Sequence, residues 1–412
     1  MPTRLLHCVC VGTLLLAPSG AIAARAAHTP CARAEPEVEQ EISFLFSAMT
    51  HAVLTQDFGG YLSHIATSDK EFLAEQTYFA KDFAKPNKAT SELAITFDPA
   101  TLEVGDGSAF ATVTFTWTQA EGEEGKEPKE RTVTLPARFE NENGAWKYAG
   151  EKWNKHEAPG VLVLFDEGLD DAAHAAVEAF AQIRAGVEKA FELDTTDFPQ
   201  RTKTIKLYGS MKHLQLSICL SYEDGLSGWN EPGEPLKILP GRDAKSPDRF
   251  RSLLAHEYGH CATFELGPTS NDMPWWILEG VAELMTEQLS DKPRERMQRT
   301  VDRWSKSGAL ANWNDLADFE KVPDKLMGRV YTQGHAMLAY ITDTYTPAKR
   351  NAWMRALSHH KSLDEATREA LGLSFADLDA QWRASLPPRE EEPADEAPTD
   401  KPNNETNTKE GT

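Results

Sequence analysis

Apolar residues change their spacing along the chain, and each change predicts a different kind of element. Over residues 38–53, and again up to about residue 83, they recur at helical spacing. Between residues 93 and 139 apolar and polar residues alternate, which predicts strands, and residues 105–107 and 143–144 are turn sequences typical of β-hairpins. Residues 36–155 are therefore expected to form an α+β domain in which helices precede a curved antiparallel sheet.

A different order of elements follows a predicted linker at residues 152–160. The pattern predicts a buried strand at residues 160–165, an Ala-rich amphipathic helix at 172–191, and strands at 204–208 and 236–239. Beyond residue 246 the pattern is mostly helical almost to the end, with Trp304 and Trp313 expected in the core. We therefore expect a second domain at residues 158–386, with a mostly helical C-terminal part.

The two ends of the chain differ from the rest. Arg4 precedes a short apolar run and then Ala21-Ile22-Ala23, which is the pattern of a signal peptide at residues 1–23. The apolar run is too short to span a bilayer, although an uncleaved anchor is the alternative. We expect export to the periplasm or the outside of the cell, without stable membrane insertion after cleavage. Residues 387–412 are rich in Pro, Glu, Asp, Asn and Thr and are expected to be a disordered acidic tail.

Composition narrows the range of partners. The chain has 412 residues, 40% of them hydrophobic, which is enough for two or three domains with real cores. The formal net charge is −21 and no basic stripe is visible, which argues against nucleic acid and anionic membranes as partners. Of the five cysteines, three follow the signal peptide, so one disulfide at most is expected, with Cys219 and Cys261 as the candidate pair.

The most informative stretch is residues 253–261, which contain the pattern His-Glu-x-x-His. Residues four apart share one face of a helix, so His256 and His260 would present two imidazoles to one point, at a span that suits a tetrahedral Zn²⁺. Glu257 would lie close enough to act on a water molecule there without being a ligand. The sequence therefore predicts the centre of a metal hydrolase.

The flanking residues predict the helix that the motif needs. Ser246 is a suitable N-cap residue, and Pro247 suits the first helical position. Chance is the alternative explanation, because a long chain rich in His and Glu sometimes contains the pattern at random.

A third ligand is expected on the next helix, for which Pro274 is a suitable start. Eighteen residues separate His260 from Glu279, and we predict that Glu279 completes the set of three protein ligands that a catalytic zinc site requires. Glu283, one turn further on, would accept a hydrogen bond from a ligating histidine. The alternative is that both are solvated carboxylates on a helix.

These tracts resemble those of the gluzincin zinc metallopeptidases. The spacing from His-Glu-x-x-His to Glu279 is that of the aminopeptidase N type enzymes, and residues 276–282 are similar to their Trp-Leu-Asn-Glu-Gly-x-Ala tract, with Leu278 in place of Asn. Thermolysin-like relatives carry an acid at the position of Glu283. Tyr331, three residues before Gly334, is similar to a Tyr-x-x-Gly tract whose tyrosine donates a hydrogen bond to the developing oxyanion.

The resemblance covers roughly residues 160–385 and implies a thermolysin-like fold. It implies one zinc ion per chain, held by His256, His260 and Glu279, and an edge strand at residues 236–239 that commonly pairs with an extended substrate. The N-terminal domain resembles the nuclear-transport-factor-like cone, also called SnoaL-like, in the order of its elements. We expect that domain to serve packing or targeting.

One departure concerns the mode of cleavage. Aminopeptidases of this type hold the substrate's free amine with the Glu of a Gly-x-Met-Glu-Asn tract, which is missing here. Residues 228–231 lie at a suitable distance but lack the Met and the final Asn. Glu231 is expected in an exposed turn, which favours internal peptide cleavage over removal of N-terminal residues.

The predicted activity is therefore zinc-dependent hydrolysis of peptide bonds in a peptide or protein substrate. Glu257 would serve as general base and Tyr331 as a hydrogen-bond donor to the oxyanion. Tyr331 as an ordinary core aromatic is the alternative. An inactive zinc-binding scaffold and another hydrolase on the same core, such as an epoxide hydrolase, also remain open.

Overall fold

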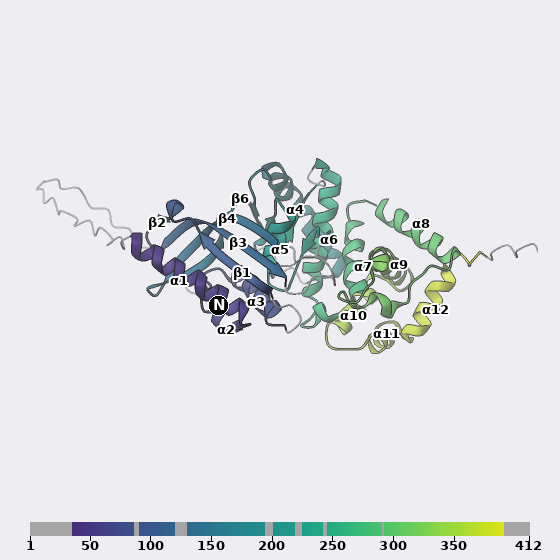
Figure 1. The fold of residues 1–412 in the computed structure, drawn as a ribbon. Coiled ribbons are helices and arrows are strands. Elements are labelled where there is room, and N and C mark those ends of the chain that lie inside the picture. Colours follow the sequence, from purple (N-terminus) through teal and green to yellow (C-terminus); the bar gives the residue numbers. More distant parts are fainter. Residues whose placement is uncertain are drawn as a thin grey trace, which may run out of the picture.

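The structure is a computed structural model that describes residues 35–85, 90–119, 130–193, 201–218, 225–241, 245–290 and 292–390. The predicted signal peptide and residues 391–412 of the predicted tail lie outside the described residues. Cys219 also lies outside them, and its suggested partner, Cys261, is a free cysteine. None of the described helices is both long enough and apolar enough to cross a membrane. Figure 1 shows an elongated molecule in which the N-terminal domain lies at one end and the C-terminal helices at the other.

The N-terminal domain is a curled antiparallel sheet with helices against one face, which confirms the predicted α+β class. Ala111, Val113 and Phe115 alternate with polar neighbours and are all buried on the helix side. At the predicted hairpin turn Asn143 and Gly144 both have positive φ angles, 56° and 91°, as a tight turn between adjacent strands requires. The sheet consists of β1 (Thr90–Phe97), β2 (Glu103–Val104), β3 (Ser108–Gln119), β4 (Glu130–Glu142) and β5 (Ala145–Glu151).

The helices of this domain fill the curve of the sheet. Phe46 packs edge-on against Phe139, with ring centroids 5.6 Å apart, and also contacts Tyr148. After α1 the chain breaks and then begins a short helix at Phe58, where the Asp57 carboxylate accepts a hydrogen bond from the Gly60 amide and caps the helix. The helical elements are α1 (Glu35–Leu54), α2 (Phe58–Leu62), α3 (Lys70–Phe83) and the 3-10 helix η1 (Pro99–Thr101).

A second five-stranded sheet begins the next domain. Its strands lie in the order β6-β7-β8-β10-β9, in which β7, β8 and β10 are parallel and the two edge strands are antiparallel to their neighbours. The strands are β6 (Asn154–Ala158), β7 (Val161–Phe165), β8 (Lys203–Leu207), β9 (Gly228–Trp229) and β10 (Leu236–Ile238). Two helices of this region, α4 (Asp170–Phe191) and α6 (Pro247–Phe264), share the apolar core with the sheet, and α5 (Met211–Ser217) lies near the first domain.

Two predictions about this sheet were wrong. The expected linker contains strand β6, which is an edge strand with one side open to solvent and therefore lacks an apolar run. The strand near residues 236–239 is not at the edge, because β10 lies between β8 and β9. The edge position belongs to β9, which is only two residues long.

The two domains share a buried layer of charged side chains. Along β8 the apolar residues Ile205 and Leu207 lie in the core with α4 and α6, whereas Lys206 points to the opposite face, as alternation along a strand requires. There Lys206 Nζ lies 2.6 Å from an oxygen of Glu75 on α3 and 3.9 Å from one of Glu151 at the end of β5. Burial would lower the pKa of Lys206, but these two carboxylates hold it above its ordinary value. The N-terminal domain therefore covers one face of the second sheet.

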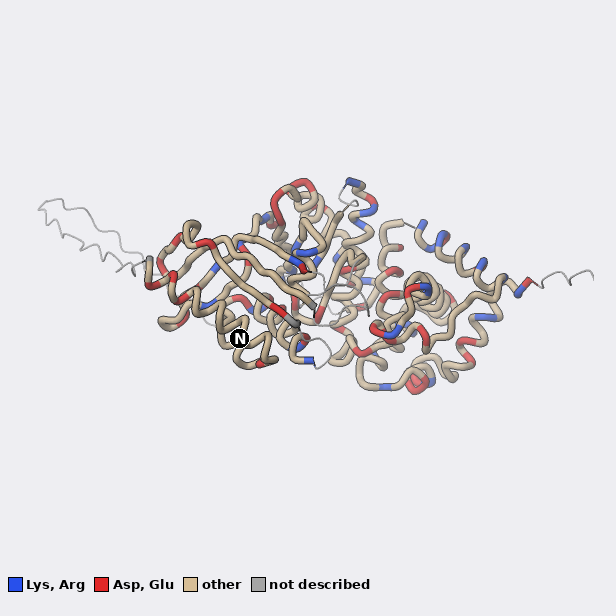
Figure 2. Tube along the Cα trace, viewed as in Figure 1, with Lys and Arg blue, Asp and Glu red and all other residues tan. Residues whose placement is uncertain are grey.

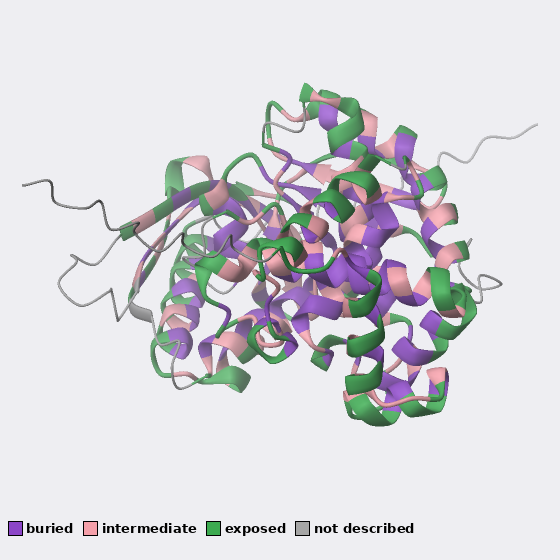
Figure 3. Ribbon diagram, turned by 90° about the vertical axis from the view of Figure 1, so that its right-hand side faces the viewer, coloured by how far each residue is buried: buried purple, intermediate pink, exposed green. Residues whose placement is uncertain are grey.

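The C-terminal region is helical and surrounds a cluster of tryptophans. Trp276 and Trp313 have ring centroids 4.3 Å apart, and Trp313 also contacts Trp382. Trp313 is buried, as expected, while Trp304 is only partly buried against the same core. Figure 3 shows the buried residues gathered inside these helices. The elements are η4 (Ser270–Asp272), α7 (Trp275–Thr286), α8 (Lys292–Lys306), η5 (Trp313–Leu316), η6 (Asp324–Leu326), α9 (Met327–Tyr345), α10 (Pro347–Leu357), α11 (Leu363–Leu371) and α12 (Phe375–Ser385).

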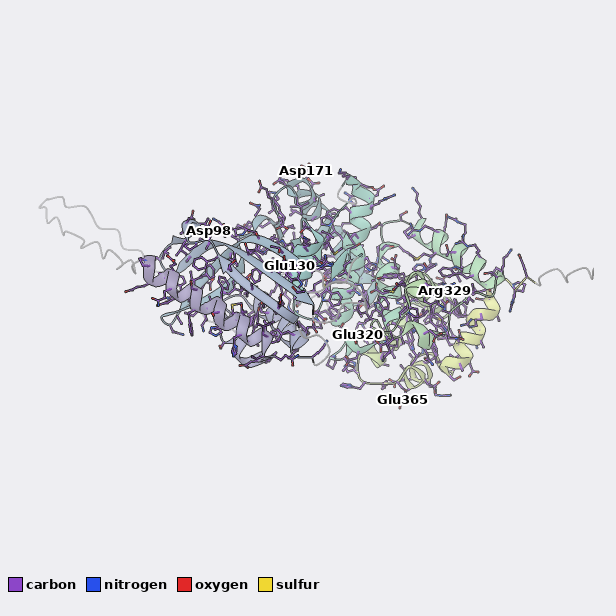
Figure 4. The ribbon with its side chains drawn as sticks, viewed as in Figure 1. Asp98, Glu130, Asp171, Glu320, Arg329 and Glu365 are labelled. Carbon is purple, nitrogen blue, oxygen red and sulfur yellow. The ribbon has the colours of Figure 1, made fainter. Side chains whose placement is uncertain are left out.

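The acidic excess of the chain is spread over the whole molecule. Figure 4 labels Asp98 and Glu130 on the N-terminal domain, Asp171 near the start of α4, and Glu365 on the C-terminal helices. Basic residues, by contrast, follow one another along α8 in Figure 2.

Candidate metal centre and its cleft

Helix α6 carries the two histidines of the motif, as predicted. It begins at Pro247 after Ser246, which occupies the N-cap position without making a side-chain capping bond. His256 and His260 lie one turn apart, with their Nε2 atoms 3.3 Å apart and their ring centroids 5.0 Å apart. The helix thus aims both imidazoles at one point.

Helix α7 adds the third predicted ligand to this point. Oε2 of Glu279 lies 3.3 Å from Nε2 of His256 and 3.5 Å from Nε2 of His260. The other oxygen of Glu279 accepts a hydrogen bond of 2.8 Å from the indole nitrogen of Trp275, which fixes the orientation of the carboxylate. Three donor atoms from two helices therefore form a nearly equilateral triangle.

The dimensions of this triangle fit a zinc ion. Zinc bonds of about 2.0–2.1 Å in tetrahedral geometry place ligand atoms roughly 3.3–3.4 Å apart. Oε2 of Glu279 is a buried oxygen with no hydrogen-bond partner in the described part of the chain, and a cation at the centre of the triangle would satisfy it. Burial alone would raise the pKa of Glu279, but His260 and His256 hold it well below its usual range, so the ligand is a carboxylate.

A second group with metal-binding side chains, His156, Asp170 and His174, fits less well. Oδ1 of Asp170 lies 2.9 Å from Nε2 of His156, and its other oxygen lies 3.6 Å from Nε2 of His174. The two imidazoles are stacked with centroids 3.9 Å apart, closer than the roughly 4.5–5 Å expected for two imidazoles that share one ion. Asp170 and His174 are also exposed. We therefore assign the candidate metal centre to His256, His260 and Glu279.

Glu257 lies beside the triangle as the motif predicts. Its side chain is buried, and Oε2 accepts a hydrogen bond of 2.6 Å from Nδ2 of Asn230. A Cβ atom at Gly228 on the edge strand would overlap the Glu257 carboxylate, so only glycine leaves room for it. Burial raises the pKa of Glu257, while His256 and His260 oppose the rise.

The contact between Asn230 and this carboxylate has no signal in the sequence, where residues 228–231 resemble only a degraded amine-binding tract. In the structure it follows β9 directly, and its Oδ1 lies 3.8 Å from the thiol of Cys261, a weak donor. The residue is thus held between the edge strand and α6, a position that only the tertiary fold defines.

Tyr331 is brought to the centre by a close crossing of α7 and α9. A Cβ atom at Gly280 would lie 2.5 Å from the carbonyl carbon of Gly334, so the two helices touch backbone to backbone at these glycines. One turn before Gly334, the Tyr331 ring lies nearly parallel to the His256 ring, with centroids 6.2 Å apart. Burial raises the pKa of Tyr331 far above its usual value, and Glu279 adds to the rise, so its hydroxyl keeps its proton.

The structure also defines the positions of Glu283, His335 and Glu231 near the candidate centre. Oε1 of Glu283 lies 3.6 Å from Nδ1 of His256, within ion-pair range but longer than the predicted hydrogen bond. His335, one turn beyond Tyr331 on α9, is a buried histidine whose Nε2 lies 2.6 Å from a Glu287 oxygen. Glu231 is in a turn, but it is partly buried rather than exposed, and it accepts a hydrogen bond of 2.7 Å from Asn271. Burial is the main cause that raises the pKa of Glu231 to about 7.

One cleft, with a volume of about 1370 Å³, is lined by His256, Glu257, His260, Glu279, Asn230, Glu231, Glu283 and Tyr331. His335 does not line it. Its walls come from β9 and α6 on one side and from α7, the start of α8 and residues 317–319 on the other. Trp229 on β9 and Phe319, which both line the cleft, are in edge-to-face contact, with centroids 6.1 Å apart. The metal centre therefore lies in a groove that a peptide segment could enter.

Comparison with models of known protein families gives no match for this chain, and no curated protein sequence matches it. The assignment of the candidate metal centre therefore rests on the positions of His256, His260 and Glu279 in the structure.

Proposed function

We propose that the chain is an exported zinc-dependent metallopeptidase with a thermolysin-like, gluzincin domain at residues 158–386. The observation that carries this proposal is the triangle of Nε2 of His256, Nε2 of His260 and Oε2 of Glu279, with the Glu257 carboxylate beside it. These three atoms would hold one zinc ion per chain. The sequence resemblance described above supports the same assignment.

A bound zinc ion supplies Lewis acidity, which lowers the pKa of water and polarises a substrate carbonyl. Glu257 is suited to be the general base, because it is a buried carboxylate close to the ligands and is not one of the three ligand donors. It takes a proton from the attacking water and passes it to the leaving amine. Asn230 holds the carboxylate in position, since it donates a short hydrogen bond to it.

Tyr331 is suited to stabilise the oxyanion of the tetrahedral intermediate. Its hydroxyl stays protonated because burial raises its pKa, and it has no hydrogen-bond partner among the described residues. It is therefore free to donate to an oxygen that becomes negative during the reaction.

The class of substrate follows from the cleft wall. Among the described residues β9 pairs only with β10, so its other edge offers backbone N–H and C=O groups to an extended chain. A peptide or protein segment fits this requirement, whereas the net charge of −21 argues against nucleic acid.

Removal of N-terminal residues is the second candidate, and one observation favours it. Glu231 lines the cleft beside Trp229 and Asn271, where a carboxylate could pair with a substrate's free amine. Matched peptides with free and acetylated N-termini separate the two modes. Cleavage of free-amine peptides alone, abolished in Glu231→Ala, would replace internal cleavage by the exopeptidase mode.

The proposal is tested on the mature chain by metal analysis after dialysis, and by digestion of a peptide library with and without a zinc chelator. We expect about one zinc per chain and peptide cleavage that the chelator abolishes. His256→Ala should lose the zinc. Glu257→Gln should keep it but lose turnover by roughly 10²–10⁴-fold, the usual contribution of a general base.

Each contrary result would overturn a different part of the proposal. Absence of zinc in the wild-type protein removes the metal centre. Zinc without cleavage of any peptide leaves a zinc-binding scaffold, and near-normal activity of Glu257→Gln removes the general-base assignment.

A further inference from the structure

The charged residues that line the cleft fall into two groups of opposite sign. Glu283, in the last turns of α7, lies near His256, whereas Glu279, one turn earlier, lies near both His256 and His260. At the start of α7, Asn271 donates a hydrogen bond to Glu231, and the backbone N–H of Trp275 donates one to the carbonyl of Ala317, so these segments lie together at one end of the cleft.

The end near the start of α7 is acidic. Three carboxylates line it, those of Glu231, Asp272 and Asp318. Asp318 is paired with Lys321, and Glu231 accepts the hydrogen bond from Asn271.

The opposite end is basic, although the protein as a whole is strongly acidic. Arg249 and Arg251 from the first turns of α6 line it, and Lys292 and Arg296 from α8 line it on the other side. Two carboxylates also line this part of the cleft, those of Asp248 on α6 and Glu283 on α7. Lys292 and Arg296 are four residues apart and so share one face of α8.

Three of these cations have no carboxylate partner within the described part of the chain, namely Arg251, Lys292 and Arg296, and all three are exposed. Their neighbours on α8 do have partners. Arg294 lies between Glu287 and Asp343, and Arg299 lies 3.7 Å from Glu295. Lys292 and Arg296, which line the cleft, thus differ from Arg294 and Arg299, which do not line it, within the row of basic residues visible along this helix in Figure 2.

We propose that this basic end is a subsite for a carboxylate group of the substrate, so that the cleft prefers peptides that carry negative charge on one side of the bound segment. The inference rests on the proposed peptidase function and adds its substrate class. Guanidinium and ammonium groups form their strongest hydrogen bonds with carboxylates, and a cleft lined by one sign of charge concentrates ligands of the other sign. The carboxylate can belong to an acidic side chain or to the C-terminus of the peptide.

The test measures binding to Glu257→Gln protein with zinc bound, so that it does not depend on turnover. Fluorescently labelled peptides of one parent sequence are compared by anisotropy. One has several Glu side chains and an amidated C-terminus, another has Gln at those positions and a free C-terminus, and a third has Gln and an amidated C-terminus. We expect one of the two charged peptides to bind about tenfold more tightly than the uncharged one. Preference for the Glu peptide would mean that the subsite binds acidic side chains, and preference for the peptide with a free C-terminus would mean that it binds the terminal carboxylate.

Charge reversal then locates the subsite. Arg296→Glu should weaken binding of the preferred peptide by roughly two- to fivefold, the range of one exposed ion pair, and Lys292→Glu with Arg296→Glu should remove most of the preference. Arg299→Glu is the matched control on the same helix, and it should leave the preference unchanged. A rise in ionic strength from about 0.1 M to about 1 M should reduce the preference, because the screening length falls from about 10 Å to about 3 Å.

The inference is overturned by equal binding of all three peptides, or by an effect of Arg299→Glu as large as that of Arg296→Glu. Failure of the peptidase proposal is distinguishable from this result. In that case the charged peptide binds with the expected preference, but wild-type protein with zinc cleaves none of the peptides.

Discussion

Asn230 and Glu257 lie 27 residues apart in the chain, yet the side-chain amide of Asn230 donates a hydrogen bond of 2.6 Å to the Glu257 carboxylate. The bond joins the end of the edge strand to the helix that carries two metal ligands. It fixes the position of the Glu257 carboxylate, to which we assign proton transfer. Asn230 is therefore a positioning residue for the proposed reaction.

Asn230→Ala should lower kcat by roughly 10- to 100-fold, because a misplaced base loses most of its advantage. KM and zinc content should change little, since Asn230 is not one of the three metal ligands. Steady-state kinetics and metal analysis measure these quantities. Asn271→Ala, which removes a cleft-lining asparagine bonded to Glu231, is the control and should not lower kcat in this way. Loss of zinc in Asn230→Ala would show a structural role instead.

Tyr331→Phe removes one hydroxyl and keeps the ring that lies over His256. We expect kcat to fall by up to about 10²–10³-fold, the cost of one oxyanion donor, with an unchanged melting temperature. Tyr340→Phe, on the same helix but away from the cleft lining, is the matched control. Equal activity of the two variants would make Tyr331 an ordinary packing residue.

Gly280→Ala should destabilise the fold by about 1–3 kcal/mol, because the new methyl group meets the backbone of Gly334 on α9. Activity should also fall, since the same crossing places Tyr331 over the centre. Urea unfolding and kinetics measure the two effects. Gly328→Ala, at the start of α9, adds a methyl group that meets nothing within 4 Å and should be neutral or slightly stabilising.

Lys206→Met should destabilise the protein by roughly 3–5 kcal/mol, because it removes the cation that lies 2.6 Å from the buried carboxylate of Glu75 and leaves that group only Lys237, at 4.0 Å. Lys85→Met removes an exposed pair with Asp82 and should cost less than about 1 kcal/mol. Urea unfolding of both variants makes the comparison. A loss no larger in Lys206→Met than in Lys85→Met would show that the charged layer between the domains contributes little.

Local patterns predicted that His256 and His260 lie together, because this depends only on helical spacing. His256 and His260 are one turn apart on any helix, and Pro247 marks where that helix begins. The alternation of residues 111–117 likewise predicted a strand, since one side of it is buried.

The parts that sequence reasoning missed depend on tertiary contacts. Strand β9 has two residues and β6 has mostly polar ones, so neither shows a periodic apolar pattern. Lys206 sits in an alternating strand like an ordinary solvent-facing residue, and only the docking of the N-terminal domain buries it. The contact between Asn230 and Glu257 has no local signal at all.

The shortness of β9 has a consequence for how much of a substrate the main chain can recognise. A strand rises about 3.3 Å per residue, so its two residues give a ladder of only about 7 Å. A peptide longer than that span forms no additional backbone hydrogen bonds with β9. Selectivity among long peptides must then come from their side chains, and affinity should level off after a few residues unless those residues carry the right charge.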